Sequence, residues 1–211
     1  MMREVLTVIL AVGLSLSVVA CAPSEFASED LGVGAHLGMP VSRVLSHLRK
    51  ALPNLPVASF SCVGGTAAVQ SPDDGFEISH SDLDRDGKVD LIVFSSTLYS
   101  RSEYARGLHK VPERFRTRFT EPEFAAFVDS FTAKYPQVKT QRGLTLGATS
   151  TEVRQTYGLV PPLAEHEGVK QLAGYRQGGN YLLFVLFGGR VVRIALLRRI
   201  WEMDYHLESI F

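Results

Sequence analysis

Four aspartates are closely spaced in residues 82–94, which read DLDRDGKVDLIVF. They are Asp82, Asp84, Asp86 and Asp90, and the first three alternate with other residues before Gly87. Proteins bind calcium through about six to eight oxygen ligands, mostly from carboxylates and backbone carbonyls. Alternate residues of a tight loop can direct three carboxylates at one ion, and Asp90 with the backbone carbonyl of Lys88 would add two ligands. The spacing therefore predicts a calcium site.

An acidic turn without an ion is the alternative interpretation of the same stretch. Asp-Gly is a favoured hairpin turn, and turns at the surface are often acidic. The four negative charges would repel one another without a counter-ion, although Arg85 and Lys88 could relieve part of the repulsion. A standard EF-hand is excluded because its last position, counted from Asp82, holds Val93 instead of the glutamate that binds the ion. If an ion does bind here, we expect it to be structural rather than catalytic.

No sequence motif indicates catalysis. The chain holds neither G-x-S-x-G nor S-x-x-K, and its six histidines lack the spacing of a zinc site. His80, close to the acidic loop, is expected on the surface of a strand, with support of the metal ligands as the alternative. Cys62 stands in an apolar setting that favours a buried side chain over a reactive one. The sequence therefore favours a protein that is not an enzyme, with an exported hydrolase of unrecognised site as an alternative.

The elements that position these residues follow an N-terminal export signal. An apolar run extends from Val5 to Ala20 and ends in small residues, which is typical of a secretory signal rather than a membrane span. The final residues, Val18-Val19-Ala20-Cys21, resemble the lipobox of bacterial lipoproteins. That resemblance implies that residues 1–20 are removed and that Cys21 carries lipid such as palmitate. The lipid would anchor the domain to a membrane of the bacterial cell envelope, in the periplasm or outside the cell. An ordinary signal peptide with a chance cysteine is the alternative.

The composition agrees with a folded exported domain. The 211 residues are 45% hydrophobic and 21% charged and carry no net charge, which argues against nucleic acid as a partner. The chain has two cysteines, so Cys62 has no disulfide partner if Cys21 carries lipid, and the fold must rest on its apolar core. Residues 21–30 are mostly small and polar, and we expect them to form a tether.

Two distant stretches share one pattern. Residues 34–44 and 143–153 both read G-x-x-L-G-x-x-x-x-x-V. In the first stretch, Pro40 suits an early helical position and an apolar helical face follows it. In the second, Thr149 and Glu152 have the spacing of a capping box. Each stretch is therefore expected to begin a helix.

Each expected helix is followed by the pattern of a β-hairpin. In the first, residues 76–80 and 89–94 flank the acidic loop, and in the second, residues 181–187 and 190–197 flank Gly188-Gly189. The stretches Gly87-Lys88-Val89 and Gly189-Arg190-Val191 then take matching places. The predicted fold class is α+β, with two helix-plus-antiparallel-hairpin units and a helical insert between them. A single α+β domain whose helix starts agree by chance is the alternative.

These patterns divide the chain into six segments. They are the signal peptide (1–20), the tether (21–30), the first α+β unit (31–100), a strand and helix insert (101–140), the second α+β unit (141–199) and a C-terminal tail (200–211). Within the insert, Glu113 to Phe119 alternates as a strand does, with Arg114, Arg116 and Arg118 on one face. Those arginines are candidate contacts for lipid head groups or an acidic partner, and a solvated strand face is the alternative. From Pro122, a helix with an aromatic stripe is expected to pack in the core and to end before Pro136.

Two family resemblances rest on these motifs. The acidic loop resembles the D-x-D-x-D-G-x-x-D-L loops of integrin-type (FG-GAP) propellers, which bind calcium at a turn between strands. It occurs once here, so no propeller is implied. The leucine-glycine, helix and hairpin pattern over residues 31–199 resembles the α+β modules of β-lactamase-inhibitor-like and SmpA/OmlA-type lipoproteins. That resemblance implies a membrane-anchored, non-enzymatic module that binds an envelope protein or acts as a scaffold, and a calcium-binding or sensing domain is the alternative.

Overall fold

A computed structural model describes residues 28–53, 66–71, 75–96, 121–159, 164–166, 170–177 and 179–198. Several predicted features lie outside these residues: the signal peptide, Cys21, Cys62, the strand that carries Arg114, Arg116 and Arg118, and the tail 200–211. Among the described helices, none combines the length and the apolar character that crossing a bilayer requires.

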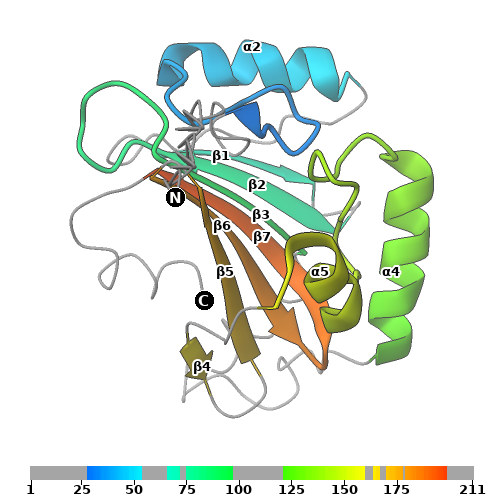
Figure 1. The fold of residues 1–211 in the computed structure, drawn as a ribbon. Coiled ribbons are helices and arrows are strands. Elements are labelled where there is room, and N and C mark those ends of the chain that lie inside the picture. Colours follow the sequence, from blue (N-terminus) through cyan, green and yellow to red (C-terminus); the bar gives the residue numbers. More distant parts are fainter. Residues whose placement is uncertain are drawn as a thin grey trace, which may run out of the picture.

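Seven strands form one antiparallel sheet in the order β1-β2-β3-β7-β6-β5-β4 (Figure 1). The strands are β1 (Thr66–Ser71), β2 (Phe76–Ser81), β3 (Leu91–Ser96), β4 (Ala164–His166), β5 (Lys170–Gln177), β6 (Asn180–Phe187) and β7 (Arg190–Arg198). The helices are α2 (Val41–Ala51), α4 (Glu121–Lys134) and α5 (Ser150–Tyr157). The predicted α+β class is confirmed. Strands β1, β4 and β5 are additions to the two predicted hairpins.

Both predicted hairpins are present. Strands β2 and β3 pair from Ser81 and Leu91 outward, so the acidic stretch forms the connection between them. Strands β6 and β7 pair from Phe187 and Arg190 outward across the Gly188-Gly189 turn. Glycine suits this turn because both residues have positive φ, 57° and 75°, which other residues adopt at a cost.

The two hairpins lie side by side through the pairing of β3 with β7. In this pair, Val93 lies opposite Ala195, with Leu91 opposite Leu197 on one side and Ser95 opposite Arg193 on the other. Val93 follows Gly87 by as many residues as Ala195 follows Gly189. The pairing is therefore symmetric about the Val93 and Ala195 position. The two units form one continuous sheet and are related by an approximate two-fold axis.

The start of each helix is fastened to its own hairpin by the same three backbone hydrogen bonds. In the first unit, Gly38 N–H donates to Val89 O (2.8 Å), Val89 N–H to Met39 O (2.9 Å) and Val41 N–H to Gly87 O (3.0 Å). The equivalent bonds in the second unit are Gly147 N to Val191 O, Val191 N to Ala148 O and Ser150 N to Gly189 O, each 2.8 Å. The shared G-x-x-L-G pattern therefore encodes the approach of the chain to a hairpin turn as well as a helix start.

The capping box predicted for the second helix is present. The Thr149 hydroxyl accepts a hydrogen bond from Glu152 N–H (3.2 Å), and the Glu152 carboxylate accepts one from Thr149 N–H (2.7 Å). Gly158 ends the helix with a φ of 97°. The first helix begins at Val41, with Pro40 at the N-cap position and no side-chain cap, and it buries Val44 and Leu48.

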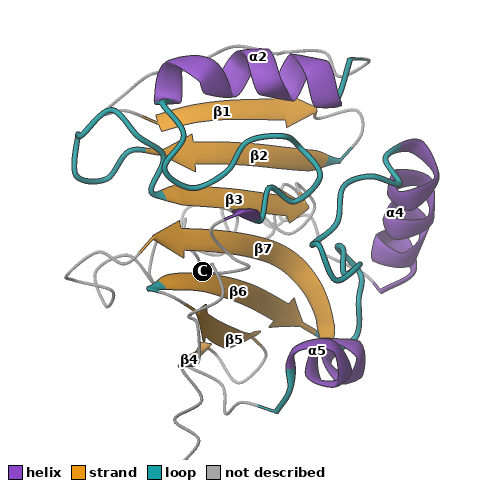
Figure 2. Ribbon diagram, turned by 45° about the horizontal axis from the view of Figure 1, so that its top comes forward, coloured by secondary structure: helices purple, strands orange, loops and turns teal. Residues whose placement is uncertain are grey.

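The core occupies both faces of the sheet, because Ile92 and Phe94 of β3 point to one face while Leu91 and Val93 point to the other. Val44 of α2 and Val153 of α5 belong to the same apolar cluster as Ile92 and Phe94. The two helices that the repeat predicts therefore cover one face together. Figure 2 shows α2 beside β1 and α5 near the ends of β6 and β7.

Helix α4 stands across the ends of the strands and carries the predicted aromatic stripe (Figure 1). Phe124, Phe131 and Tyr135 are buried, and Phe131 lies 5.2 Å from Phe76 and 5.4 Å from Phe94 between ring centroids. The helix ends at Lys134, before Pro136, as its sequence predicts. The stripe is therefore core packing.

The described fold begins within the stretch that was assigned to the tether. Glu29 is fully buried, and its carboxylate accepts hydrogen bonds from Leu31 N–H (2.9 Å) and Gln141 N–H (2.8 Å). Glu29 thus ties the beginning of the first unit to the beginning of the second.

Candidate metal site

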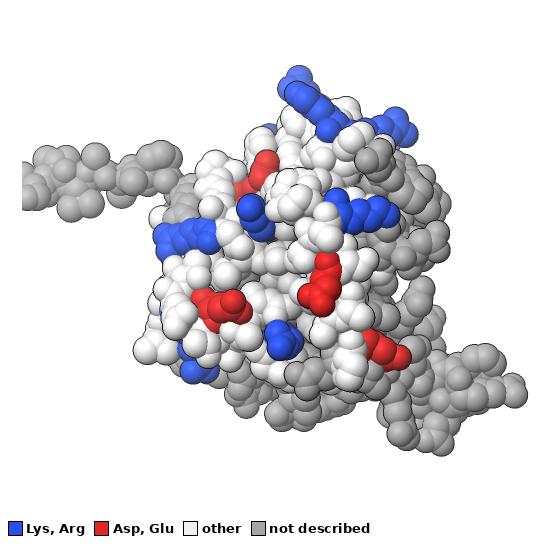
Figure 3. All heavy atoms as spheres, turned by 90° about the vertical axis from the view of Figure 1, so that its right-hand side faces the viewer, with Lys and Arg blue, Asp and Glu red and all other residues white. Residues whose placement is uncertain are grey.

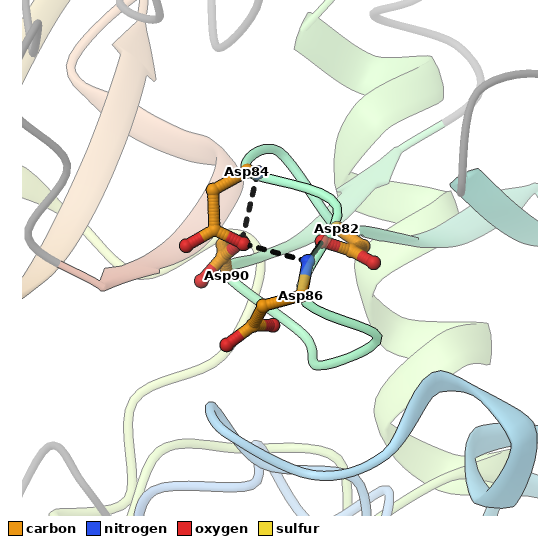
Figure 4. A group of neighbouring side chains, drawn as sticks. All are labelled: Asp82, Asp84, Asp86 and Asp90. Carbon is orange, nitrogen blue, oxygen red and sulfur yellow. Dashed lines mark hydrogen bonds between the residues drawn. The ribbon is translucent and has the colours of Figure 1, made fainter.

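The loop between β2 and β3 brings the four predicted aspartates together. Asp82, Asp84, Asp86 and Asp90 each offer one carboxylate oxygen, and these oxygens all lie within 4.8 Å of one another (Figure 4). Asp90 is 0% exposed and Asp82 is 8% exposed, whereas Asp84 and Asp86 face solvent. The group has the size and the ligand type to hold a metal ion that prefers oxygen.

Backbone N–H groups of the loop hold the carboxylates in place. Asp82 accepts from Asp86 N–H (3.1 Å) at one oxygen and from Gly87 N–H (2.8 Å) at the other. Asp84 accepts from Asp86 N–H (3.0 Å), and Asp86 accepts from Lys88 N–H (2.8 Å). These bonds require the chain to turn tightly at Gly87. Its φ of 83° is one that glycine adopts readily.

Within the described residues, Asp90 has one carboxylate oxygen that accepts no hydrogen bond. Its Oδ2 accepts from Leu83 N–H (2.9 Å) and Asp84 N–H (3.4 Å), whereas Oδ1 is buried and has no such donor. Burial, with a smaller contribution from the charge of Asp84, raises the pKa of Asp90 against the opposing effect of those hydrogen bonds and of Arg198. A buried carboxylate oxygen without a donor is unfavourable, and a bound cation would satisfy it.

The backbone carbonyl of Lys88, the other predicted ligand, lies beside the start of α2. Lys88 forms an isolated antiparallel β-bridge with Pro40, the residue before α2. Its neighbours Gly87 and Val89 make the backbone hydrogen bonds to Val41 and Met39. Within the described chain, the Lys88 carbonyl oxygen accepts no hydrogen bond. No described donor therefore competes with an ion for this oxygen.

Two cations neutralise part of the loop charge. Lys88 Nζ lies 3.6 Å from Asp86 Oδ2, and Arg198 at the end of β7 reaches both Asp86 (Nη2 to Oδ2, 3.6 Å) and Asp90 (Nη1 to Oδ1, 3.5 Å). Although partial desolvation acts to raise the pKa of Asp86, the Lys88 N–H bond and the charges of Lys88 and Arg198 lower it overall. The expected contribution of Lys88 is confirmed, whereas Arg85 forms no ion pair with the carboxylates described here.

Arg198 is the residue of this site that the sequence analysis missed. Its backbone N–H donates to Asp90 O (2.8 Å), which continues the pairing of β7 with β3 up to the loop. Lys88, by contrast, lies within the loop itself. The acidic loop is therefore the meeting point of three elements: the approach to α2, the first hairpin and the last strand of the second unit.

His80 is not the surface strand residue that we expected. It lies in β2 on the face of Phe76 and Ile78, is 1% exposed, and neither ring nitrogen has a hydrogen-bond partner in the described structure. Burial lowers its pKa from 6.5 to about 3, so the ring is neutral. Nothing places it among the carboxylates, which form the group without it.

The charged side chains on one face of the molecule are mixed in sign. In Figure 3, the Lys and Arg residues lie interspersed with Asp and Glu residues across the described surface. This view agrees with the balanced composition of the chain.

Three solved protein chains have a distant similarity to this one, among them one from Bacillus subtilis and one from Staphylococcus aureus. No protein-family model matches the chain, and no curated protein matches it. A DUF4309 family protein (YjgB) from Bacillus subtilis has 10% identity and a TM-score of 0.37, over 73% of this chain and 77% of that one. A cysteine-rich secretory protein (SAV1118) from Staphylococcus aureus has 12% identity and a TM-score of 0.37, over 82% of this chain. The match spans 48% of the SAV1118 chain.

Proposed function

We propose that the protein binds calcium through the loop of Asp82, Asp84, Asp86 and Asp90, with the Lys88 carbonyl as a further ligand. The observation that carries the proposal is the convergence of four carboxylates around Asp90, whose buried Oδ1 has no hydrogen-bond donor in the part of the chain that the structure describes. Carboxylate and carbonyl oxygens in an irregular set suit calcium better than magnesium, which requires a nearly ideal octahedron.

The proposed ion is structural. It would fix the loop to which the start of α2 and the end of β7 are bonded, through Gly87, Val89 and Asp90. Calcium would therefore stabilise the pairing of β3 with β7, through which the two units meet, as well as the loop. The equivalent turn of the second unit, Gly188-Gly189, makes the same bonds to its helix without any carboxylate. The hairpin itself therefore does not account for four aspartates.

The test is the melting temperature of the full chain in detergent, in chelator and then with rising calcium, with magnesium as a control. A ligand that binds only the folded state at about a hundred times its dissociation constant adds about 2.7 kcal/mol of stability. For a chain of this size, that corresponds to a rise of about 5–10 °C. Asp84→Ala combined with Asp86→Ala should abolish the rise, and Asp129→Ala, on the exposed side of α4, should leave it intact. An unchanged melting temperature up to millimolar calcium would contradict the proposal.

A second proposal concerns the place and partner of the protein. We infer that it is a lipoprotein of the bacterial cell envelope, held to the membrane by lipid on Cys21, which works as a non-enzymatic protein-binding or scaffolding module. Support comes from the lipobox pattern and from the repeated helix and hairpin unit, whose two copies share the same three bonds. That repeat agrees with the resemblance to tandem modules of envelope lipoproteins.

Metabolic labelling with a fatty acid analogue tests the anchor. The wild-type chain should take up label and sediment with membranes, and Cys21→Ala should do neither, while Cys62→Ala serves as the matched cysteine control. A labelled Cys21→Ala chain would contradict the lipid site. Cross-linking in intact cells then tests the module, because a binding or scaffolding role requires a specific envelope partner that is lost when the fold is disrupted.

A further inference from the structure

We infer that Arg198 is a built-in competitor for the cation: its guanidinium group occupies the acidic loop when the loop is empty, and a divalent ion displaces it. The inference rests on the proposed calcium site and adds a residue that sets its affinity and its preference for divalent ions. It gives the end of the second unit a direct part in a site whose ligands all come from the first.

The contacts of Arg198 are those of a displaceable charge. Its Nη1 lies 3.5 Å from Asp90 Oδ1, and its Nη2 lies 3.6 Å from Asp86 Oδ2. Both distances exceed the usual hydrogen-bond length of about 2.7–3.2 Å, so the guanidinium group meets the carboxylates by charge without directed bonds. The Asp90 oxygen that it faces is the buried one without a donor. The Arg198 guanidinium group is therefore close to Asp90, but Asp90 Oδ1 does not have the direct bond that a metal ion would form with it.

The backbone keeps Arg198 beside the loop while leaving its side chain room to move. Arg198 N–H donates to Asp90 O at 2.8 Å, so the residue stays at the end of β7 next to the site. Its side chain is 36% exposed, and a long arginine stem can turn its charged end toward water at small cost. The competitor is thus always present at a fixed position, unlike a dissolved ion.

The same arrangement favours divalent over monovalent ions. Sodium or potassium would bring one positive charge in exchange for the one positive charge that moves away, so the exchange gains little. Calcium brings two charges and repels the guanidinium group from the loop. At the surface of a protein, the repulsion that remains between the ion and a displaced arginine corresponds to roughly a three- to ten-fold weakening of calcium binding.

The experiment is calorimetric titration of calcium into the full chain in detergent. Arg198→Gln should bind calcium roughly three- to ten-fold more tightly than the wild type, and Arg198→Lys, which retains the charge, should stay near the wild type. Arg176→Gln is the matched control, because this substitution removes the same charge at a distance from the loop. Arg176 is exposed on β5, which is separated from β3 by β7 and β6. It should leave calcium binding unchanged. Sodium, titrated in the same way, should bind measurably to Arg198→Gln alone or to none of the variants.

The outcomes separate this inference from the proposed function. Equal calcium affinity of the wild type and Arg198→Gln, or weaker binding by Arg198→Gln, would overturn the competition and leave the calcium site standing. Absence of calcium binding in every variant would overturn the calcium site and the competition with it. If Arg198→Gln does not fold, nuclear magnetic resonance of arginine Nε–H groups in the wild type replaces it. The signal that Arg198→Lys lacks should then shift on calcium addition, and a static signal would refute displacement.

Discussion

Val93 and Ala195 lie opposite each other in the central pair of strands, and they hold the same position in the two halves of the sheet. Each residue pair on one side of this position has an equivalent pair on the other side. For example, the pair of Leu91 and Leu197 is equivalent to the pair of Ser95 and Arg193. The two halves therefore share one hydrogen-bonded interior rather than a surface of contact. This makes the two units parts of one cooperative fold.

If the fold is cooperative, a destabilising substitution in either half should lower the stability of both halves together. Phe94 and Leu196 occupy equivalent positions next to Val93 and Ala195, and both are buried. Phe94→Ala and Leu196→Ala should each lower the free energy of unfolding by about 2–5 kcal/mol because each leaves a cavity. Urea unfolding followed by near- and far-ultraviolet circular dichroism should show one coincident transition in both variants. Two separate transitions would mean that the halves unfold independently.

The two equivalent glycines before the helices predict different costs for the same change. Gly38 and Gly147 have φ values of 78° and 84°, a region where a residue with a Cβ is strained by about 1–2 kcal/mol. A Cβ at Gly38 would meet open space, whereas one at Gly147 would lie 2.5 Å from a methyl group of Val128. Gly38→Ala should therefore cost about 1–2 kcal/mol, and Gly147→Ala more.

Adding Val128→Ala to Gly147→Ala should recover part of the loss, because it removes the methyl groups in conflict. Chemical denaturation of five chains gives the comparison: the wild type, Gly38→Ala, Gly147→Ala, Val128→Ala and the variant with both Gly147→Ala and Val128→Ala. Equal costs at the two glycines, or no interaction between Gly147 and Val128, would show that α4 yields to the added atom.

His80 predicts an acid-sensitive core. An unfolded histidine binds its proton near the ordinary pKa of 6.5, whereas the buried ring binds it only near 3. The unfolded chain therefore holds more protons in this interval, so His80 reduces stability as the pH falls from 6.5 toward 3. His80→Leu should be more stable than the wild type by about 1–3 kcal/mol at neutral pH, because it removes two unsatisfied buried nitrogens.

The advantage of His80→Leu should widen on acidification through the same interval. Melting temperatures of both chains across this pH range provide the measurement. A difference between the two chains that stays constant with pH would show that the ring finds a partner for its proton on acidification.

Asp90 predicts opposite effects of one substitution with and without calcium. Since burial raises its pKa above the ordinary 3.8, the stability that the residue confers is greatest below that value and is lost as the pH rises through the raised pKa. In chelator at neutral pH, Asp90→Asn should therefore be at least as stable as the wild type. In about 10 mM calcium the order should reverse, because only the wild type keeps the buried ligand.

Melting temperatures at neutral pH and near pH 3.8 in chelator check the sign of the first effect. A full calcium response in Asp90→Asn would remove Asp90 from the proposed ligand set.

Local patterns account for what the sequence predicted well. The capping box of Thr149 and Glu152 and the cluster of four aspartates each depend on residues close together in the chain. The hairpins followed from their turns and from the strand-like runs on either side of those turns. These features need no knowledge of which strands become neighbours.

The position of Arg198 could not be predicted in the same way. It depends on the register of β3 against β7, which brings Arg198 next to Asp90 across two units of the fold. No local pattern marks an arginine at a strand end as a partner for a distant loop.

His80 is a different case, because a signal was present. Phe76, Ile78 and His80 alternate along β2, and a period of two places all three on one face of the sheet. The polarity of histidine favoured the surface, while the alternation favoured the core, and the alternation was correct.

The buried carboxylate of Glu29 determines where a pull on the chain would be felt. A force applied N-terminal to Ser28 enters the fold at Glu29, whose two oxygens hold Leu31 at one side and Gln141 at the other. Next to it, Gly32 lies so close to the Gln137 carbonyl that no side chain fits between them. The load is thus divided at once between the beginnings of both units. A pull from the N-terminal side should therefore have to break the bonds of Glu29 to both units before it reaches the strands of the sheet.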